Sequence, residues 1–228
     1  MSSTGFDEGD YMKLVAETLK MDDKVKAQSA IMDRYDPEKK LSLVVDEWGV
    51  WLAPTPGSNP GFLQQQNSLR DAIIAALNLN IFMRHADRVR MSNIAQMANV
   101  LQAMVLTEGP KMLLTPTYHV YKLYLPFQDA TLVPVTFEAG TYRLGETSVP
   151  RVDAVAATTD GFALAEVGLL LDLVAQHQHV AAAEGHHGVA RMQVRHRHRC
   201  RRRSRSQAGE VALRLTASFC VRAPDTAR

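Results

Sequence analysis

The chain has 228 residues, of which 46% are hydrophobic, and its formal net charge at pH 7 is only +2. This length suits one large domain or two small ones, and the hydrophobic content excludes a wholly disordered chain. Two cysteines exclude a disulfide framework, and the most apolar run, 162–175, is broken by Glu166 and Asp172 and is too short to cross a membrane. The N-terminus has no basic and apolar leader, so we expect no signal peptide and a cytoplasmic location.

The first predicted element is a helix over residues 8–34. Apolar side chains from Tyr11 to Leu19 recur at the spacing of one helix face. The two acids at 22–23 suit the start of a second helical segment. Pro37 ends the helix, because the residue before a proline avoids the helical conformation. No strand precedes this helix, so the N-terminus resembles the middle of an α/β fold.

Residues 41–46 predict a short buried strand that stops at two carboxylates, Asp46 and Glu47. Barrel and open-sheet enzymes place reactive groups at the carboxyl ends of such strands. Because side chains alternate along a strand, we expect Asp46 and Glu47 to point to opposite sides, so that only one faces a given pocket. The alternative is an ordinary strand end, whose acids are solvated or cap a helix.

A loop rich in proline and glycine follows over residues 53–61, at the strand end where substrates bind. Asn67 or Ser68 can cap the next helix, whose apolar stripe over residues 69–81 predicts packing against a sheet. His85, at the end of that helix, is expected to cap or pack rather than to act in catalysis.

A second strand is predicted over residues 89–95, ending at Gln96, where Asn93 supports the geometry of the strand end. A buried segment over 100–107, a turn at 109–110 and a helix over 117–125 follow. From residue 130 the pattern changes to short strands, at 131–137 and 152–156, separated by glycine and proline.

Several stretches combine into a recognisable series of motifs. They are Asp-Glu-Trp-Gly-Val-Trp at 46–51, Gln-Asn-Ser-Leu-Arg-Asp-Ala at 66–72, His-Ala-Asp-Arg-Val at 85–89, Asn-Ile-Ala-Gln at 93–96 and Leu-Thr-Pro-Thr-Tyr-His-Val at 114–120. Each motif is weak alone, but their order and spacing are specific. Together they resemble family 51 of the glycoside hydrolases, the retaining α-L-arabinofuranosidases.

The resemblance implies roles for three residues. Glu47 would be the catalytic nucleophile at the end of the seventh barrel strand. Gln96, at the end of the eighth, would contact the hydroxyls of the arabinose ring, since an amide both donates and accepts hydrogen bonds; the alternative is a glutamine that satisfies only loop backbone. Trp48 would line the substrate site as an apolar wall or a stacking face.

The resemblance also implies an α/β fold. This fold would consist of three parts: the last units of a (β/α)8 barrel over residues 1–128, the truncated start of a β-sandwich over 129–160, and an irregular tail over 161–228. The implied activity is hydrolysis of terminal α-L-arabinofuranosyl groups from arabinan or arabinoxylan oligosaccharides. It implies no cofactor and no metal, and it allows a homo-oligomer in the intact family enzyme.

One part of the family's chemistry is missing from this sequence. The family's acid/base is a Glu in an Asn-Glu pair, and the sequence contains no Asn-Glu dipeptide. Retaining glycosidases need two carboxyl groups, so we expect the isolated chain to be inactive. The alternative function is that of a non-catalytic protein: an inactive, sugar-binding remnant, or a basic nucleic-acid-binding protein that acts through its arginine-rich tail.

Residues 157–228 do not fit the family's sandwich. The Leu- and Ala-rich stretch 163–180 predicts a helix; six of the eight histidines lie between His177 and His198, and eight arginines lie between Arg191 and Arg205. Such a tail suits nucleic-acid binding, a metal-binding tract, or translation of a GC-rich gene in the wrong frame. We favour the third interpretation, do not expect nucleic acid as a partner, and expect disorder after about residue 160.

Overall fold

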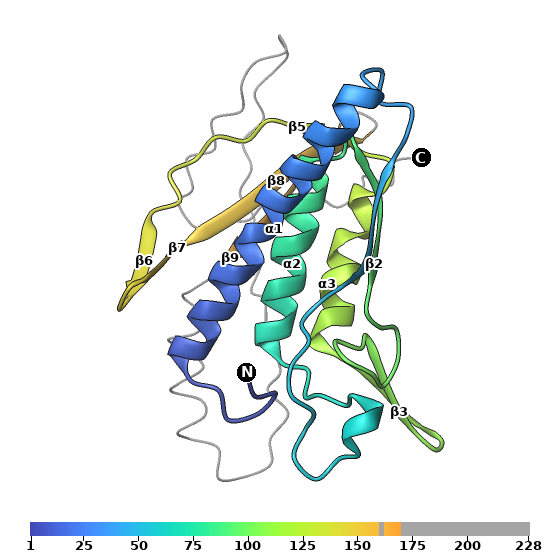
Figure 1. The fold of residues 1–228 in the computed structure, drawn as a ribbon, viewed down its shortest axis with the longest axis vertical. Helices are drawn as coiled ribbons and strands as arrows, with labels where there is room; N and C mark the ends of the chain where they lie inside the picture. The colour runs from blue at the N-terminus through green and yellow to red at the C-terminus, as the bar shows by residue number, and fades with distance from the viewer. Residues whose placement is uncertain (160–161, 170–228) are drawn as a thin grey trace, which may run out of the picture.

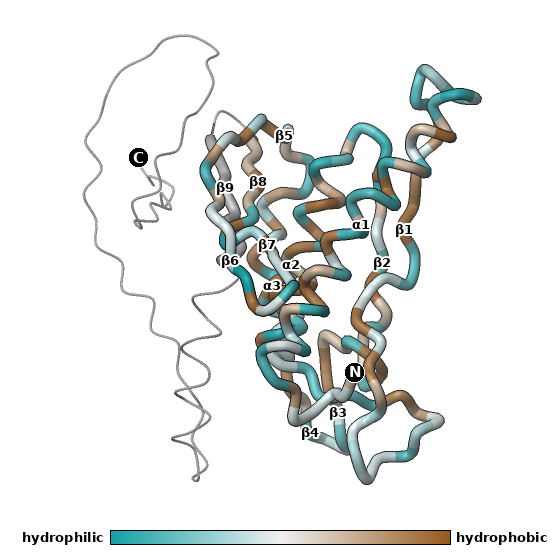
Figure 2. Tube along the Cα trace, turned by 60° about the vertical axis from the view of Figure 1, so that its left-hand side comes forward, coloured by the Kyte–Doolittle hydropathy of each residue, from teal (hydrophilic) through white to brown (hydrophobic). Residues whose placement is uncertain are grey.

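The computed structural model describes residues 1–159 and 162–169, and three helices form the middle of its fold. In Figure 1 the helices run side by side: α1 (Glu8–Tyr35), α2 (Leu69–Arg84) and α3 (Pro116–Tyr124). On one side lie two parallel strands, β1 (Leu43–Trp48) and β2 (Val89–Ile94). On the other side, as Figure 2 shows, lie β5 (Thr131–Val133), β6 (Thr141–Leu144), β7 (Thr147–Pro150), β8 (Val152–Thr159) and β9 (Phe162–Leu169).

The remaining elements are small. A hairpin of β3 (Val105–Glu108) and β4 (Lys111–Leu114) turns at Gly109-Pro110, where the sequence predicts a turn. Two single-turn 3-10 helices are η1 (Pro60–Phe62), at the end of the expected loop, and η2 (Leu125–Phe127), which continues α3. Within the described ranges, every helix is too short or too polar to be a membrane span.

Helix α1 is one continuous helix, where the sequence suggested two segments. Asp7 caps its first turn by accepting a hydrogen bond from the backbone of Asp10 at 2.8 Å. The helix ends at Tyr35, before Pro37, as predicted. The acid at Asp22 does not begin a new segment; it lies mid-helix, where its carboxylate accepts a hydrogen bond from Lys26 one turn later.

Helix α2 has the start and the end that the sequence predicts. Ser68 occupies the N-cap, and its backbone N–H donates to the carboxylate of Asp71 at 2.8 Å. At the other end, the Nε2 atom of His85 lies 2.7 Å from Oδ1 of Asp22 on α1. His85 therefore joins two helices, which confirms a packing role.

Strand β1 differs from its prediction in place and in burial. It spans Leu43–Trp48 rather than 41–46, and Val44 is 42% exposed, so the strand is not buried. The helices cover one face, and β2 is the only strand paired with β1 in the part of the chain that the structure describes. A parallel strand is buried only when both of its faces are covered.

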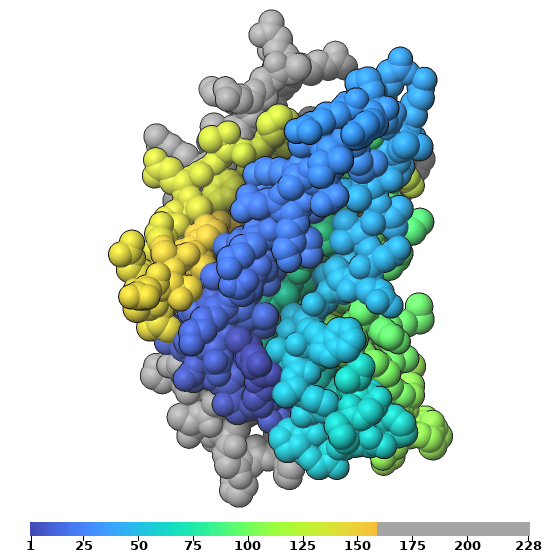
Figure 3. All heavy atoms as spheres, in the orientation of Figure 1, coloured from blue at the N-terminus to red at the C-terminus, as the bar shows by residue number. Residues whose placement is uncertain are grey.

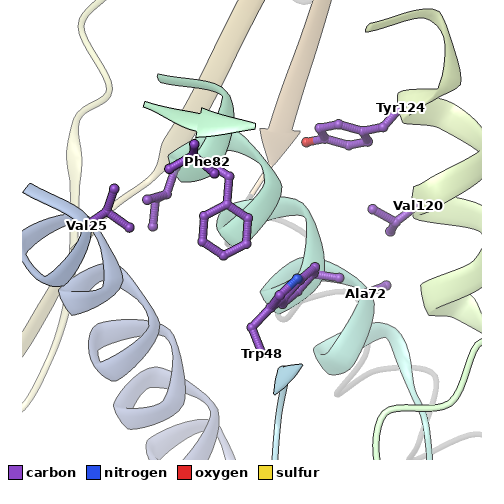
Figure 4. Packing of buried hydrophobic residues seen from close by; sticks show 9 residues of the cluster. Val25, Trp48, Ala72, Phe82, Val120 and Tyr124 are labelled. Carbon is purple, nitrogen blue, oxygen red and sulfur yellow. The ribbon is translucent and has the colours of Figure 1, made fainter. Parts of the chain in front are cut away.

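Two apolar clusters hold the helices to the strands. The first joins α1 to α2 and to the chain after β1; its buried members are Tyr11, Met12, Val15, Val50, Leu52, Ile74, Leu77 and Val149. In the second, shown in Figure 4, Trp48 at the end of β1 packs against Phe82 on α2 and near Val120 on α3. Each large side chain buried in this way contributes about 1.5–3 kcal/mol.

The β6–β7 hairpin is attached to α1 rather than to the larger sheet. In Figure 3 the hairpin lies beside the helix at the edge of the molecule. The hydroxyl of Tyr142 donates to the carboxylate of Glu8, and Val149 is buried in the first cluster. Residues far apart in sequence thus close one side of the α1–α2 pair.

The larger sheet has the order β5-β8-β9 and is antiparallel. Strands β5 and β8 confirm the strands expected at 131–137 and 152–156. The helix expected over 163–180 is wrong at its start, because Phe162–Leu169 pairs with β8 along its whole length. Pairing with a neighbouring strand overrides the helical propensity of leucine and alanine. The same strand differs from the disorder expected after about residue 160. The rest of the expected helix, the disorder expected beyond residue 169 and the Arg/His-rich region lie outside the described residues.

Candidate active site

The carboxyl ends of β1 and β2 meet and form a shallow depression. The backbone N–H of Ala95 donates to the carbonyl of Trp48 at 2.9 Å, which joins the two strand ends. The depression is open, has a volume of about 420 Å³ and is lined by Asp46, Glu47, Asn93, Ile94, Ala95 and Gln96. The structure therefore brings together Glu47 and Gln96, two of the three residues that the sequence selected.

Asp46 and Glu47 both line this depression, so the prediction that only one of them could face a pocket is wrong. The pairing of β1 with β2 is irregular between Val45 and Trp48, and Glu47 has a φ of 53°, in the left-handed region. That conformation interrupts the alternation of side chains. Strain of this kind costs about 1–3 kcal/mol and often marks functional positions.

The two carboxylates have different surroundings. The Nδ2 atom of Asn93 donates to the carboxylate of Asp46 across the strand pair, as expected of a residue that supports the strand end. Glu47 is exposed, and its carboxylate takes part in no hydrogen bond or ion pair among the described residues. Glu47 is thus the carboxylate in the depression that is left free to meet a ligand.

Trp48 does not line the depression; it lies in the core and is 3% exposed. Its ring stacks on Tyr121 at 6.3 Å between centroids and meets Phe82 edge-on at 5.3 Å. Figure 4 shows its side chain directed toward α2 and α3. The substrate contact predicted for Trp48 is therefore not supported, because the turn at Glu47 directs the indole into the second cluster.

Gly49 follows Trp48 in a conformation that requires glycine. Its φ is +148°, and a Cβ atom there would lie 3.3 Å from the carbonyl oxygen of Ala95 and 3.4 Å from Oε1 of Gln102. The chain leaving β1 thus passes close to the chain leaving β2. This close approach keeps Glu47 and Gln96 at one site.

Two buried glutamines hold the chain just beyond Gly49. Gln102 accepts from the backbone N–H of Val50 at 2.9 Å and donates to the carbonyl of Asp71 at 2.6 Å. Gln65 donates to the carbonyl of Val50 at 2.9 Å and accepts from the N–H of Leu52 at 3.0 Å. Neither glutamine belongs to the motifs that were recognised in the sequence. A signal existed for Gln102, since a polar side chain inside a predicted buried segment needs partners.

The first turn of α2 contains a buried ion pair beneath the same region. Nη2 of Arg70 lies 3.1 Å from Oδ2 of Asp71, and the two side chains are 1% and 0% exposed. Burial raises the pKa of Asp71 from its usual value, against the opposing effects of Arg70 and Ser68. The guanidinium also lies 4.2 Å from the ring centroid of Phe6. This pair fixes the start of α2 and was also missed.

The comparisons with known proteins agree with the motifs. The family model of the alpha-L-arabinofuranosidase C-terminal domain matches residues 46–218. An intracellular exo-alpha-L-arabinofuranosidase of Bacteroides ovatus is 46% identical over 158 residues, 68% of this chain and 30% of that protein. An intracellular exo-alpha-(1->5)-L-arabinofuranosidase of Streptomyces lividans is 27% identical over 164 residues, 65% of this chain and 25% of its own length.

A solved structure shows the same relationship in three dimensions. The GH51 arabinofuranosidase from Xanthomonas axonopodis pv. citri superposes with a TM-score of 0.72 at 58% identity. The match covers 74% of this chain and 34% of that chain. The chain thus spans about a third of the length of these relatives. Because the family model matches more than half of its residues, the chain belongs to the family 51 α-L-arabinofuranosidases.

Proposed function

We propose that this chain supplies the nucleophile side of a retaining α-L-arabinofuranosidase site. The observation that carries the proposal is the depression at the ends of β1 and β2, where the free carboxylate of Glu47 lies beside Gln96. In this proposal β1 and β2 are the last two strands of a (β/α)8 barrel over residues 1–128. Strands β5 and β8 begin a β-sandwich that the sequence placed at 129–160, and β9 extends it into the first residues of the stretch that the sequence assigned to an irregular tail over 161–228.

The proposed chemistry begins with Glu47 as nucleophile. Its ionised carboxylate attacks the anomeric carbon of a terminal arabinofuranosyl group and forms a covalent glycosyl-enzyme, while the bond to the leaving oxygen breaks. A second carboxyl group, about 5–5.5 Å away in retaining enzymes, protonates that oxygen and later removes a proton from the attacking water. We assign the second group outside the described residues, because Asp46 is already bonded to Asn93.

The neighbouring residues would position the sugar and the nucleophile. The amide of Gln96, exposed in the depression, can donate to one ring hydroxyl and accept from another. For Trp48 we propose a positioning role in place of a sugar contact. Its buried ring anchors the residue next to Glu47, so that the carboxylate is held at the strand end.

The names of the relatives suggest the substrate and its location. Both curated relatives are named intracellular exo-arabinofuranosidases, which supports an arabinose-containing oligosaccharide as substrate and a cytoplasmic site of action. A homo-oligomer of the intact enzyme is compatible with this proposal. The competing function is a sugar-binding remnant without catalysis, which is favoured by the lining of the depression, where Glu47 is the one carboxylate without a side-chain partner among the described residues.

The test is to join residues 1–156 to the preceding part of the Bacteroides ovatus enzyme and to assay release of p-nitrophenol from the aryl α-L-arabinofuranoside. We expect Glu47→Ala to abolish turnover and external azide to restore part of it, by replacing the lost nucleophile. Gln96→Ala should lower kcat/KM by an amount that corresponds to at most about 1–3 kcal/mol of lost transition-state stabilisation, as expected for one lost hydrogen-bonding partner.

Glu108→Ala is the matched control, because this acid is exposed on the β3–β4 hairpin, outside the depression. It should leave turnover unchanged. If Glu47→Ala retained near-normal turnover without azide, Glu47 could not be the nucleophile, and the proposed mechanism would fail.

A further inference from the structure

A second and larger groove lies beyond the carboxyl ends of β1 and β2. Its volume is about 1110 Å³, against about 420 Å³ for the depression, and the two share no lining residue. One wall is formed by residues 61–64, in the loop after β1, and the other by residues between 99 and 113, which follow β2 and include the β3–β4 hairpin. In Figure 1, η1 and this hairpin lie side by side at the lower end of the molecule. Gln96 of the depression and Asn99 of the groove belong to one short segment, so the two hollows are neighbours along the chain.

The two walls of the groove are fastened together and have an unusual backbone. The backbone N–H of Leu101 donates to the carbonyl of Leu63 at 2.9 Å. The side-chain amide of Asn99 donates to Oγ1 of Thr107 at 2.9 Å and accepts from the backbone N–H of Thr107 at 2.7 Å. Leu63, Asn99 and Leu101 have φ values of 50°, 59° and 51°, in the left-handed region. Such conformations are strained in residues other than glycine and cluster where ligands bind.

The groove presents apolar and hydrogen-bonding side chains together. Phe62, Met112 and Leu113 line it and are 70%, 68% and 57% exposed, although large apolar side chains are usually buried. The amide of Gln64 and the ammonium group of Lys111 also line it, and among the described residues neither takes part in a hydrogen bond or an ion pair. An aromatic ring suits the apolar C–H face of a sugar, and free amide and ammonium groups suit its hydroxyls.

The charge of the groove argues against a polyanion as its ligand. Lys111 is the one lysine or arginine among the described residues that line it. Surfaces that bind a phosphate backbone gather several basic side chains along one face. The groove therefore suits a neutral ligand rich in hydroxyls better than it suits a nucleic acid.

We infer that this groove binds an arabinose-containing oligosaccharide at sugars beyond the one that reaches Glu47. Phe62 stacks on the face of one of these sugars, and Gln64 and Lys111 form hydrogen bonds with its hydroxyls. The inference rests on the proposed function, from which it takes the class of ligand. The name of the Streptomyces lividans relative supplies the linkage of the probe, α-(1→5).

The experiment titrates the full 228-residue chain with α-(1→5)-linked arabinopentaose in a calorimeter, and separately with L-arabinose. We expect the pentaose to bind at least about tenfold more tightly than the single sugar, because only the pentaose is long enough to reach the groove. Phe62→Ala and, as a second variant, Lys111→Met should each weaken binding of the pentaose by about fivefold or more. Neither should lower the melting temperature, because both side chains are exposed.

Tyr35→Ala is the matched control, since this aromatic side chain is 86% exposed at the end of α1, outside the groove. It should bind the pentaose as the wild type does. The inference is overturned if the pentaose binds no more tightly than arabinose, or if Phe62→Ala binds it normally. It is also overturned if the wild-type chain self-associates through this surface, so that Phe62→Ala abolishes the association.

The titration is independent of turnover, so it separates this inference from the proposed function. Weaker binding of the pentaose to Phe62→Ala, together with normal turnover of the joined enzyme carrying Glu47→Ala, would support the groove and count against the proposed nucleophile. The opposite pair of results would support the nucleophile and overturn the groove.

Discussion

Gln102 connects the segments that leave the two strands at the depression. Its side chain is fully buried and joins the chain after β1, through Val50, to the first turn of α2, through Asp71. Its backbone N–H donates to the carbonyl of Ala95, just before Gln96. One residue, through its side chain and its backbone, thus links both strand ends to a helix. A buried polar group of this kind is costly to leave without partners.

We expect Gln102→Leu to lower the free energy of unfolding by about 2–4 kcal/mol, because the Val50 N–H and the Asp71 carbonyl would lose their partners. Urea unfolding followed by tryptophan fluorescence measures this change. Gln64→Leu is the control, since Gln64 is exposed, and it should change stability by less than about 0.5 kcal/mol. Equal urea midpoints for the two variants would contradict the linking role of Gln102.

At the scale of elements, an ion pair between Arg88 and Asp36 holds together the junction of α1, β1 and β2. Arg88, just before β2, has a fully buried side chain and bonds the carboxylate of Asp36 at 2.7 Å and the carbonyl of Leu41 at 2.9 Å. The same carboxylate accepts from the backbone N–H groups of Leu41 at 2.8 Å and Lys40 at 3.0 Å. The end of α1 is thereby fastened to the start of both strands.

The pKa of Asp36 is lowered, first by the Leu41 amide and then, against burial, by Arg88 and Lys40. Since the folded state holds this carboxyl deprotonated more strongly than the unfolded state, its contribution is complete above the unfolded pKa of about 3.9. That contribution is lost as the pH falls through the lower folded pKa. We therefore expect the stability difference between wild type and Asp36→Asn to shrink as the pH falls from 6 toward 3.

Urea midpoints at several pH values measure this difference. Glu38→Gln serves as the control, because Glu38 forms an ion pair with Lys40 in which both side chains are exposed. Exposed ion pairs contribute little to the free energy of unfolding. The account of this junction is wrong if the difference between wild type and Asp36→Asn stays constant over that pH range.

At the scale of the whole molecule, the described residues contain the two carboxylates on which the proposed glycosidase site depends. The depression contains two carboxylates on consecutive residues, and one of these, Asp46, is bonded to Asn93. Retaining hydrolysis requires carboxyl groups on both sides of the scissile bond. The open face of β1–β2 is the place where the structure leaves room for the missing side.

We therefore expect the purified 228-residue chain to release no p-nitrophenol from the aryl α-L-arabinofuranoside by itself. Ordinary enzymes turn over at about 1–1,000 per second. A rate above about 1 per second that is abolished by Glu47→Gln would show that the chain carries a complete site. Glu108→Gln, on the exposed hairpin, controls for the loss of one charge.

Much of the fold follows from local signals in the sequence. Pro37 ends α1, and Ser68 with Asp71 starts α2, because these effects act within one helical turn. That Glu47 and Gln96 lie close together was also predictable, since both residues stand at the ends of consecutive strands. The motifs around them identify the family.

Tertiary structure alone decided the details of the site. The left-handed turn at Glu47 places the side chains of Asp46 and Glu47 on the same side of β1 and directs Trp48 into the core. In a regular strand, the side chains of Asp46 and Glu47 would alternate between the two faces. Gln102 acquires its role from partners more than ten residues away. Residues 162–169 form a strand because β8 is available to pair with them. Periodicity and propensity report the preferences of a local segment, and contacts between distant segments are energetically strong enough to override them.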